Sequence, residues 1–365
     1  MQKRSWLWIL TLLLTLGVAA AQSSDSSQTA AKKEPSVKAY LLVGDVYYSS
    51  GEYDAALIAF RRALEKEPNN VYALYGLGRT QLRLLQFSAA IENLKKAIAL
   101  DSNFAPAYVA LAEAYTDRFI YAQDKKSAAP YLDQALMVLD DAQRVDPNYY
   151  PTYNQRGLVY QYKGDLKKAE AAFKKALELE PNDPTVRYNL AQVYLSEGKL
   201  DEALEMLKQG VTLDPSSAQL QLLYGKVLAV KGDLAGAEQA LEKGTKLEPL
   251  NAGAWLNLGQ VYFLEGKYDE AIKALQSSLE LDPLSYPETY FYLGRTLLEQ
   301  GKHEEARSNF SKAVKLAPEN ADYHYWLARS LIELGKKDQA KSELQKAVQL
   351  DPHHDAARKA LTDLK

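Results

Sequence analysis

One pattern of 34 residues is written nine times between residues 37 and 354. Each copy has an alanine at the same place: Ala56, Ala90, Ala135, Ala169, Ala203, Ala237, Ala271, Ala306 and Ala340. Twelve residues later come Pro68, Ser102, Pro147, Pro181, Pro215, Pro249, Pro283, Pro318 and Pro352. A fixed period of this length is typical of stacked supersecondary units, because one unit alone cannot bury its apolar face. We therefore expect one elongated repeat domain with a long curved surface.

The copy at residues 252–286 indicates how one repeat folds. Apolar residues in its first half fall at helical spacing and predict a first helix, helix A. Gly266 suits the left-handed residue that ends a helix, since glycine has no Cβ. Asp269 is expected to cap the second helix, helix B. Pro283 ends the hairpin because proline cannot continue a helix.

The same turn residues and small residues recur in other copies. The glycine after helix A recurs as Gly51, Gly164, Gly198, Gly232, Gly301 and Gly335, and the capping aspartate as Asp54, Asp201 and Asp338. Before the next helix A stand Asn70, Asp183, Ser217, Asn251 and Asn320, which we expect to cap it. Small residues such as Gly259 on helix A should let helix B approach closely, with Leu275 filling the space beside it.

These residues closely resemble the tetratricopeptide repeat family. The signature spacing is held by Trp255, Leu258, Gly259, Tyr262, Ala271 and Pro283, and the other copies match it in one phase. The resemblance implies an all-α fold, a right-handed α-solenoid of nine helix-turn-helix repeats. It also implies that helix A of each repeat lines a concave face that holds an extended or helical peptide. Most such domains are adaptors and not enzymes.

The predicted domain organisation has four parts. Residues 1–21 form a signal peptide, 22–36 a flexible linker, 37–354 the repeats and 355–365 a capping helix. The repeat boundaries are 37–70, 71–104, 105–149, 150–183, 184–217, 218–251, 252–286, 287–320 and 321–354. The third repeat carries an 11-residue insertion near 116–130, for which we expect a longer helix A and a projecting turn near Asp124 to Ser127.

The N-terminal residues have the pattern of a targeting segment. Lys3 and Arg4 precede an apolar stretch from Trp6 to Leu16, and small residues follow up to Ala21. This order is typical of a secretory signal that is cleaved after export. The alternative is an uncleaved membrane anchor, although the stretch is shorter than the ~20 residues of a spanning helix. Both interpretations predict an exported protein, periplasmic or secreted in the first case.

Composition argues against several classes of chemistry. The chain has no cysteine, four histidines and a net charge of −3. It therefore lacks thiolate ligands and nucleophiles, and no basic stretch is long enough to follow nucleic acid. Neighbouring His353 and His354 do not converge on a metal from the start of a helix. We expect no enzyme activity, no cofactor, no metal and no nucleic-acid partner.

The predicted binding groove comes from the fifth and ninth places of each helix A, with asparagines one place along in two repeats. The candidate residues are Tyr75, Arg79, Tyr188, Asn189, Gln192, Lys226, Asn257, Gln260, Phe291, Arg295, Tyr325 and Arg329. Rings beside guanidinium groups suit an extended peptide, and Arg295 and Arg329 favour an acidic or C-terminal carboxylate. The competing interpretation is that single tyrosines pack against the next helix A. The Lys and Asn clamp for terminal carboxylates of some family members is missing from the first three repeats.

The sequence thus predicts an exported, non-enzymatic scaffold that binds protein or peptide partners in its concave groove, for envelope assembly or secretion. The alternative is a glycan-binding protein of an envelope polysaccharide system, because stacked tyrosines can hold sugar rings.

Overall fold

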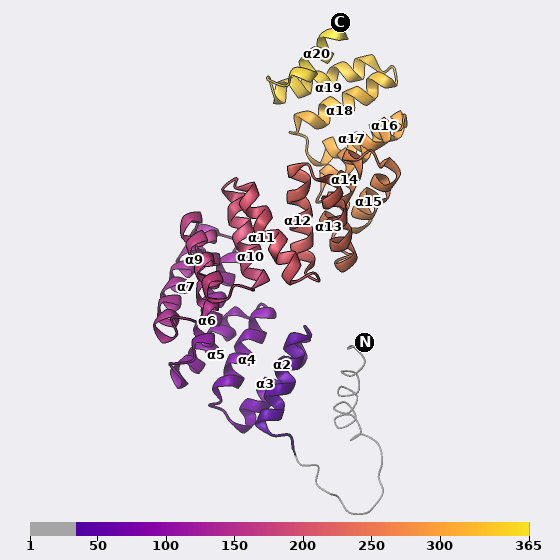
Figure 1. The fold of residues 1–365 in the computed structure, drawn as a ribbon. Helices are drawn as coiled ribbons and strands as arrows, with labels where there is room; N and C mark the ends of the chain where they lie inside the picture. Colours follow the sequence, from indigo (N-terminus) through magenta and orange to yellow (C-terminus); the bar gives the residue numbers. More distant parts are fainter. Residues whose placement is uncertain (1–33, 365) are drawn as a thin grey trace, which may run out of the picture.

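The computed structural model describes residues 34–364 as a solenoid of helices (Figure 1). The signal peptide predicted at 1–21 and nearly all of the predicted linker lie outside the described residues. The described part has 19 α-helices and no strand. Their bounds are α2 Val37–Ser49, α3 Tyr53–Lys66, α4 Val71–Arg83, α5 Phe87–Leu100, α6 Ala105–Ile120, α7 Lys125–Val145, α8 Tyr150–Tyr162, α9 Leu166–Leu179, α10 Pro184–Ser196, α11 Leu200–Leu213, α12 Ala218–Lys231, α13 Leu234–Leu247, α14 Ala252–Leu264, α15 Tyr268–Leu281, α16 Pro287–Glu299, α17 His303–Leu316, α18 Ala321–Glu333, α19 Lys337–Leu350 and α20 Asp355–Asp363.

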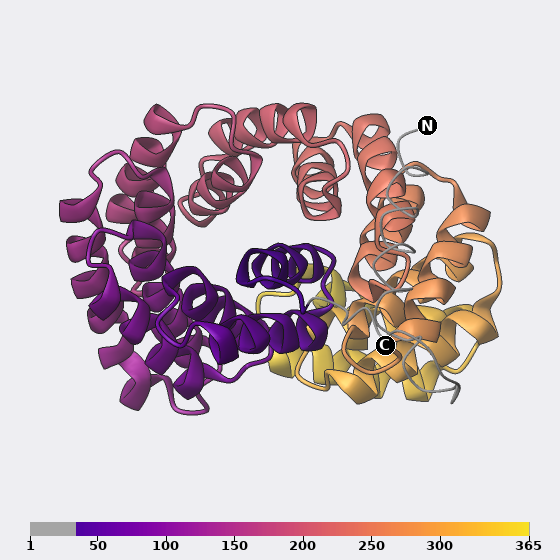
Figure 2. The ribbon, with the colours of Figure 1, turned by 90° about the horizontal axis from the view of Figure 1, so that it is seen from below.

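The helices form nine antiparallel pairs that stack in chain order. Each even-numbered helix from α2 to α18 is a helix A, and the odd-numbered helix that follows is its helix B. Each helix B from α3 to α17 also packs on the next helix A, and α19 packs on α20, so contacts between neighbouring helices run along the whole solenoid. The pairs coil into a right-handed superhelix, which appears as a ring when seen from below (Figure 2). The predicted fold class is confirmed.

The A helices line the inner wall of the coil. Successive even-numbered helices from α2 to α18 contact one another, except that α10 and α12 have little contact. Successive odd-numbered helices of the described part show no comparable packing. Elements on the inside of a curve lie closer together than those on the outside. The expectation that helix A forms the concave face is therefore correct.

Glycine and asparagine act at the helix ends as the sequence predicts. All seven turn glycines have positive φ, for example +75° at Gly266, where a Cβ would meet no atom within 4 Å. In the second repeat Leu85 takes this conformation, with φ 58°. The side chains of Asn70, Asp183, Ser217, Asn251 and Asn320 each accept a backbone N–H in the first turn of the next helix A.

The predicted aspartate caps of helix B are wrong. Helix α15 begins at Tyr268, so its N-cap is Lys267 and Asp269 lies inside the first turn. Asp54, Asp201 and Asp338 likewise lie in first turns. There a carboxylate still interacts favourably with the helix dipole. The aspartates that do cap helix B are Asp124, Asp165 and Asp233, and the last two lie directly after a turn glycine.

The small residues of helix A leave room for one large side chain of helix B. A Cβ on Gly259 would lie 2.6 Å from Leu275 Cγ, and one on Gly294 would lie 2.8 Å from Phe310 Cε1. Leu275 and Phe310 are fully buried. Burying a side chain of this size contributes about 1.5–3 kcal/mol, and the missing Cβ is what permits it.

The residue at the fourth place of helix A ties the helix to the preceding turn. Trp255 Nε1 donates to the carbonyl oxygen of Pro249 at 2.9 Å, and Tyr153 Oη donates to that of Pro147 at 2.7 Å. The signature tryptophan place thus has a polar function as well as an apolar one, because it satisfies a carbonyl that the turn leaves free.

The third repeat takes up its extra residues in both helices. Helix α6 has 16 residues and α7 has 21. Most of the added length therefore extends helix B, whereas a longer helix A was expected from the sequence. The break lies at Tyr121 to Asp124, and Asp124 caps α7. Phe119 packs near Tyr162 of the next helix A, with ring centroids 6.1 Å apart.

The C-terminal end of the stack is covered by α20. Ala357 of this helix is fully buried, whereas Arg358, Lys359 and Asp363 are exposed. This is the wet outer face expected of a capping helix. Among residues 34–364, no helix is both long and apolar enough to cross a membrane.

Candidate peptide-binding groove

All twelve predicted groove residues lie on even-numbered helices, which form the inner wall. They come from α4, α10, α12, α14, α16 and α18. Contacts cluster at the two ends of the solenoid and are sparser in the middle. Lys226 is exposed, and most of the others are half-buried.

The N-terminal cluster is built around Arg79. Its guanidinium carbon lies 4.3 Å from the ring centroid of Tyr48 and 4.7 Å from that of Tyr75. Arg79 Nη2 also donates to Asp45 Oδ1 at 3.0 Å, across from the neighbouring helix A. The charge of Arg79 is therefore stacked between rings and neutralised by an acid of the protein itself.

A second layer of charge lies one turn further along the same helices. Arg83 Nε donates to Tyr48 Oη at 3.1 Å, and its Nη2 pairs with Glu113. Asp117 lies close by, and burial, with a smaller contribution from Glu113, raises its pKa to about 7. Burial also raises the pKa of Tyr75. Tyr75 and Asp117 are half-buried in the wall, and this burial is the main cause of both shifts.

Around α10 the predicted groove residues are a tyrosine and two amides, and the cation Lys226 follows on α12. Asn189 Nδ2 donates to Asn154 Oδ1 at 3.0 Å, and Asn189 is buried. Burial raises the pKa of Tyr188, and a hydrogen bond with Gln192 opposes this. The asparagine pair joins two successive A helices, α8 and α10. Asn189 therefore stabilises the wall itself, in addition to being a predicted groove residue.

The C-terminal cluster is built around Arg295. Its guanidinium carbon lies 4.3 Å from the ring centroid of Trp326, 4.7 Å from that of Phe263 and 5.9 Å from that of Phe291. Arg329 Nη1 donates to Tyr325 Oη at 3.2 Å. The pairing of rings with arginine predicted for the C-terminal repeats is therefore present as geometry.

Sequence reasoning missed three aromatic rings that lie in neighbouring repeats and stack on Arg79 or Arg295. Tyr48 and Phe263 occupy the twelfth place of the preceding helix A, and Trp326 the sixth place of the following one. These places lie about one turn from the ninth, so they share its face. Scanning them for aromatic residues would have found all three.

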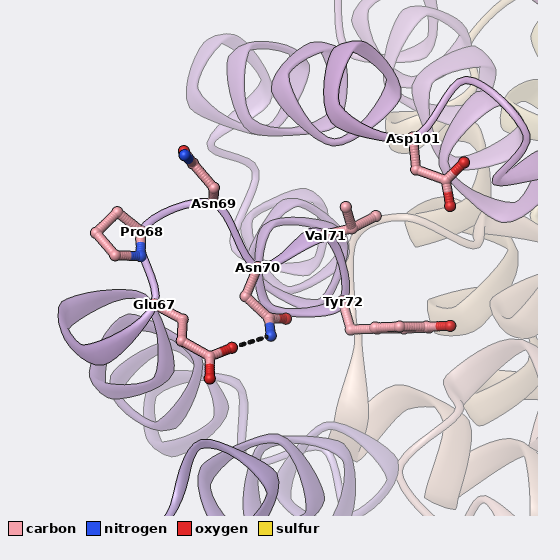
Figure 3. A pocket seen from close by; sticks show the side chains of 7 residues that line it. All are labelled: Glu67, Pro68, Asn69, Asn70, Val71, Tyr72 and Asp101. Atoms are coloured by element: carbon pink, nitrogen blue, oxygen red, sulfur yellow. Dashed lines mark hydrogen bonds between the residues drawn. The ribbon is translucent and has the colours of Figure 1, made fainter.

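Two hollows of the surface lie at turns between repeats, away from the predicted residues. One is lined by Glu67 to Tyr72 together with Asp101 (Figure 3). Asn70 Nδ2 donates to Glu67 Oε2 at 2.8 Å, while Asn70 Oδ1 accepts the backbone N–H of Ala73 at 3.0 Å. Glu248 and Asn251 repeat this arrangement at a second hollow. Their recurrence marks these hollows as parts of the repeat turn.

The described residues contain no group of three or more histidine, cysteine, aspartate or glutamate side chains that could hold a metal ion. The hydrogen-bonding and stacking groups of the inner wall suit a peptide or protein surface.

Nine helical hairpins with a wall of rings and arginines define an α-solenoid of the kind that serves as an interaction scaffold. Family comparisons agree: residues 44–84 and 71–104 match models of the tetratricopeptide repeat, and residues 148–364 match that of the C-terminal domain of cilia and flagella-associated protein 70. The chain belongs to the tetratricopeptide repeat family.

Two curated relatives match parts of the chain. Superkiller protein 3 of Schizosaccharomyces pombe is 27% identical over an alignment of 186 residues, which covers 42% of this chain and 13% of the relative. BBSome complex member BBS4 of Xenopus tropicalis is 30% identical over 143 residues, 38% of this chain and 27% of the relative. The chain thus spans about a quarter or less of the length of these relatives.

Solved structures share the repeat architecture. A thermophilic repeat protein of Thermus thermophilus is 42% identical with a TM-score of 0.51, covering 53% of this chain and all of that one. PilF of Pseudomonas aeruginosa is 23% identical with a TM-score of 0.52, covering 59% and 97%. The second likeness concerns the fold alone.

Proposed function

We propose that this chain is an exported, non-enzymatic scaffold that binds peptide or protein partners on its concave face, in envelope assembly or secretion. The observation that carries the proposal is the inner wall itself, where rings and arginines of successive A helices form clusters at both ends of the groove. Stacked rings offer apolar contact, and guanidinium groups offer donors to a peptide backbone or carboxylate.

Reversing charge in the groove tests its role in binding. The chain carrying Arg295→Glu and Arg329→Glu is crosslinked to its neighbours in the native envelope. The proteins attached to it are then identified and compared with those attached to the parent. We expect the double variant to lose partners because two wall cations become anions. The matched control carries Arg62→Glu and Arg307→Glu on the outer helices α3 and α17. If the groove variant retains every partner, the groove is not the binding surface.

Export is supported by the order of charge, apolar residues and small residues at the N-terminus. The same cells provide the test: we expect the chain in the periplasmic or secreted fraction with an intact mass that lacks residues 1–21. Recovery of the full-length chain from the membrane fraction would favour the anchor instead. Among the described residues, no contact of the groove indicates a glycan ligand specifically. We therefore expect the chain to bind nothing on a glycan array.

A further inference from the structure

The ninth place of helix A forms one row of side chains along the inner wall. In the first three repeats this row reads Asp45, Arg79 and Glu113, so acid and base alternate. In the last three repeats it reads Gln260, Arg295 and Arg329, so two cations stand beside a neutral amide. The two ends of the groove thus use the same places with different charge.

The rings around the two central arginines correspond place by place. Tyr48 and Phe263 are both at the twelfth place of the preceding helix A, and Tyr75 and Phe291 are both at the fifth place of the arginine's own helix. Each guanidinium group lies over its two rings. Stacking holds a guanidinium in place and leaves its N–H edge available for an acceptor.

The acceptor differs between the two ends. At Arg79 it is Asp45 Oδ1, 3.0 Å from Nη2. At Arg295 the place of Asp45 is taken by Gln260, which carries no charge. Among residues 34–364 no carboxylate lies within ion-pairing distance of Arg295 or Arg329.

The acidic residues nearest in sequence do not supply a negative charge to Arg295 or Arg329. Glu288 and Glu299 of α16 and Glu333 of α18 are exposed, and Asp322 Oδ1 of α18 lies 3.2 Å from His354 Nε2. The guanidinium carbons of Arg295 and Arg329 lie 4.3 Å and 5.9 Å from the centroid of the Trp326 ring, and two neighbouring cations favour an anion because both charges gain from the same ligand.

We propose that Gln260, Arg295 and Arg329 form a site for a carboxylate of the bound peptide, which takes the position that Asp45 holds at the other end of the groove. The inference rests on the proposed function and names the ligand group it requires. The carboxylate comes from a peptide C-terminus or from an aspartate or glutamate side chain, and the experiment separates these sources.

The test supplies the missing acid within the protein. In Gln260→Asp the new carboxylate occupies the place of Asp45 and pairs with Arg295, so it competes with the ligand. The matched control is Gln276→Asp, which adds the same charge at an exposed site on helix B of the same repeat. Circular dichroism confirms that both variants fold.

The probes are three pools of N-acetylated hexapeptides, measured by calorimetry on the exported chain. One pool has free C-termini and no acidic residue, the second has amidated C-termini with aspartate and glutamate, and the third is neutral and amidated. We expect the parent to bind the first or the second pool but not the third. Gln260→Asp should weaken that binding about tenfold or more, and Gln276→Asp should change it less than about twofold.

Equal binding by the parent and Gln260→Asp would overturn the carboxylate site, as would equal binding of the neutral pool or binding of no pool. If the crosslinked partners are nevertheless lost in the Arg295→Glu, Arg329→Glu variant, the groove function stands and only the carboxylate site fails. If that variant also retains every partner, both fail.

Discussion

Arg79 and Arg295 show that one residue type at one place of the repeat can serve two purposes. Both are stacked on rings, but Asp45 neutralises Arg79, whereas Gln260 leaves the charge of Arg295 available. The first contact joins two A helices of the wall. The difference lies in a neighbour 34 residues earlier in one case and 35 in the other, and not in the arginine.

Asp117 gives the N-terminal end a dependence on pH. Its pKa in the folded chain is about 7, against 3.8 as the ordinary value, so the folded state holds the proton more tightly. The contribution of Asp117 to the free energy of unfolding is therefore fully present below pH ~4 and is lost as the pH rises towards 7. The groups that face it are Glu113, Arg83 and Tyr162.

We expect Asp117→Asn to remove this loss. After allowance for solvent screening, the variant should be about 1–2 kcal/mol more stable than the parent at pH ~8 and equal to it at pH ~4. Denaturant unfolding at the two pH values measures the difference, with Asp201→Asn, an exposed carboxylate, as control. The same difference at both pH values would contradict the assignment.

Among the helix ends, the sequence predicts the start of helix A best. Asn70 and Asn251 lie directly before the apolar pattern, and at Asn251 the preceding residue is Leu250, which cannot compete for the position. The start of helix B is misplaced at Asp269, because Lys267 at the true N-cap has no side-chain acceptor and gives no signal. Backbone geometry alone sets that boundary, as Leu85 shows by adopting φ 58° without glycine.

The two adjacent asparagines of the first inter-repeat turn provide a matched pair. Asn70→Ala removes the acceptor of the Ala73 N–H and the bond to Glu67, so we expect it to cost about 1 kcal/mol. Asn69→Ala, at an exposed neighbour in the same turn, should change stability by less than about 0.5 kcal/mol (Figure 3). Urea unfolding followed by circular dichroism compares them; indistinguishable midpoints would show that the cap contributes nothing.

At the scale of the whole molecule, the period alone predicts the solenoid, because the repeats place a small residue of helix A and a large residue of helix B at the same two positions. Gly259 with Leu275 and Gly294 with Phe310 are two copies of one contact. The groove is less predictable, since the rings that hold Arg295 come from three different repeats. Phe263 and Trp326 meet it only once the superhelix has curved.

Contacts that skip a helix B lie on the inner wall, between successive A helices. Pulling the two ends of the molecule apart therefore strains that wall before it disturbs the hairpins. Ion pairs between neighbouring repeats, such as Lys231 with Asp201 and Lys336 with Glu304, are exposed and resist little. The inner wall has least contact of its own between α10 and α12, so anything bound across several A helices would fix the separation of the repeats there.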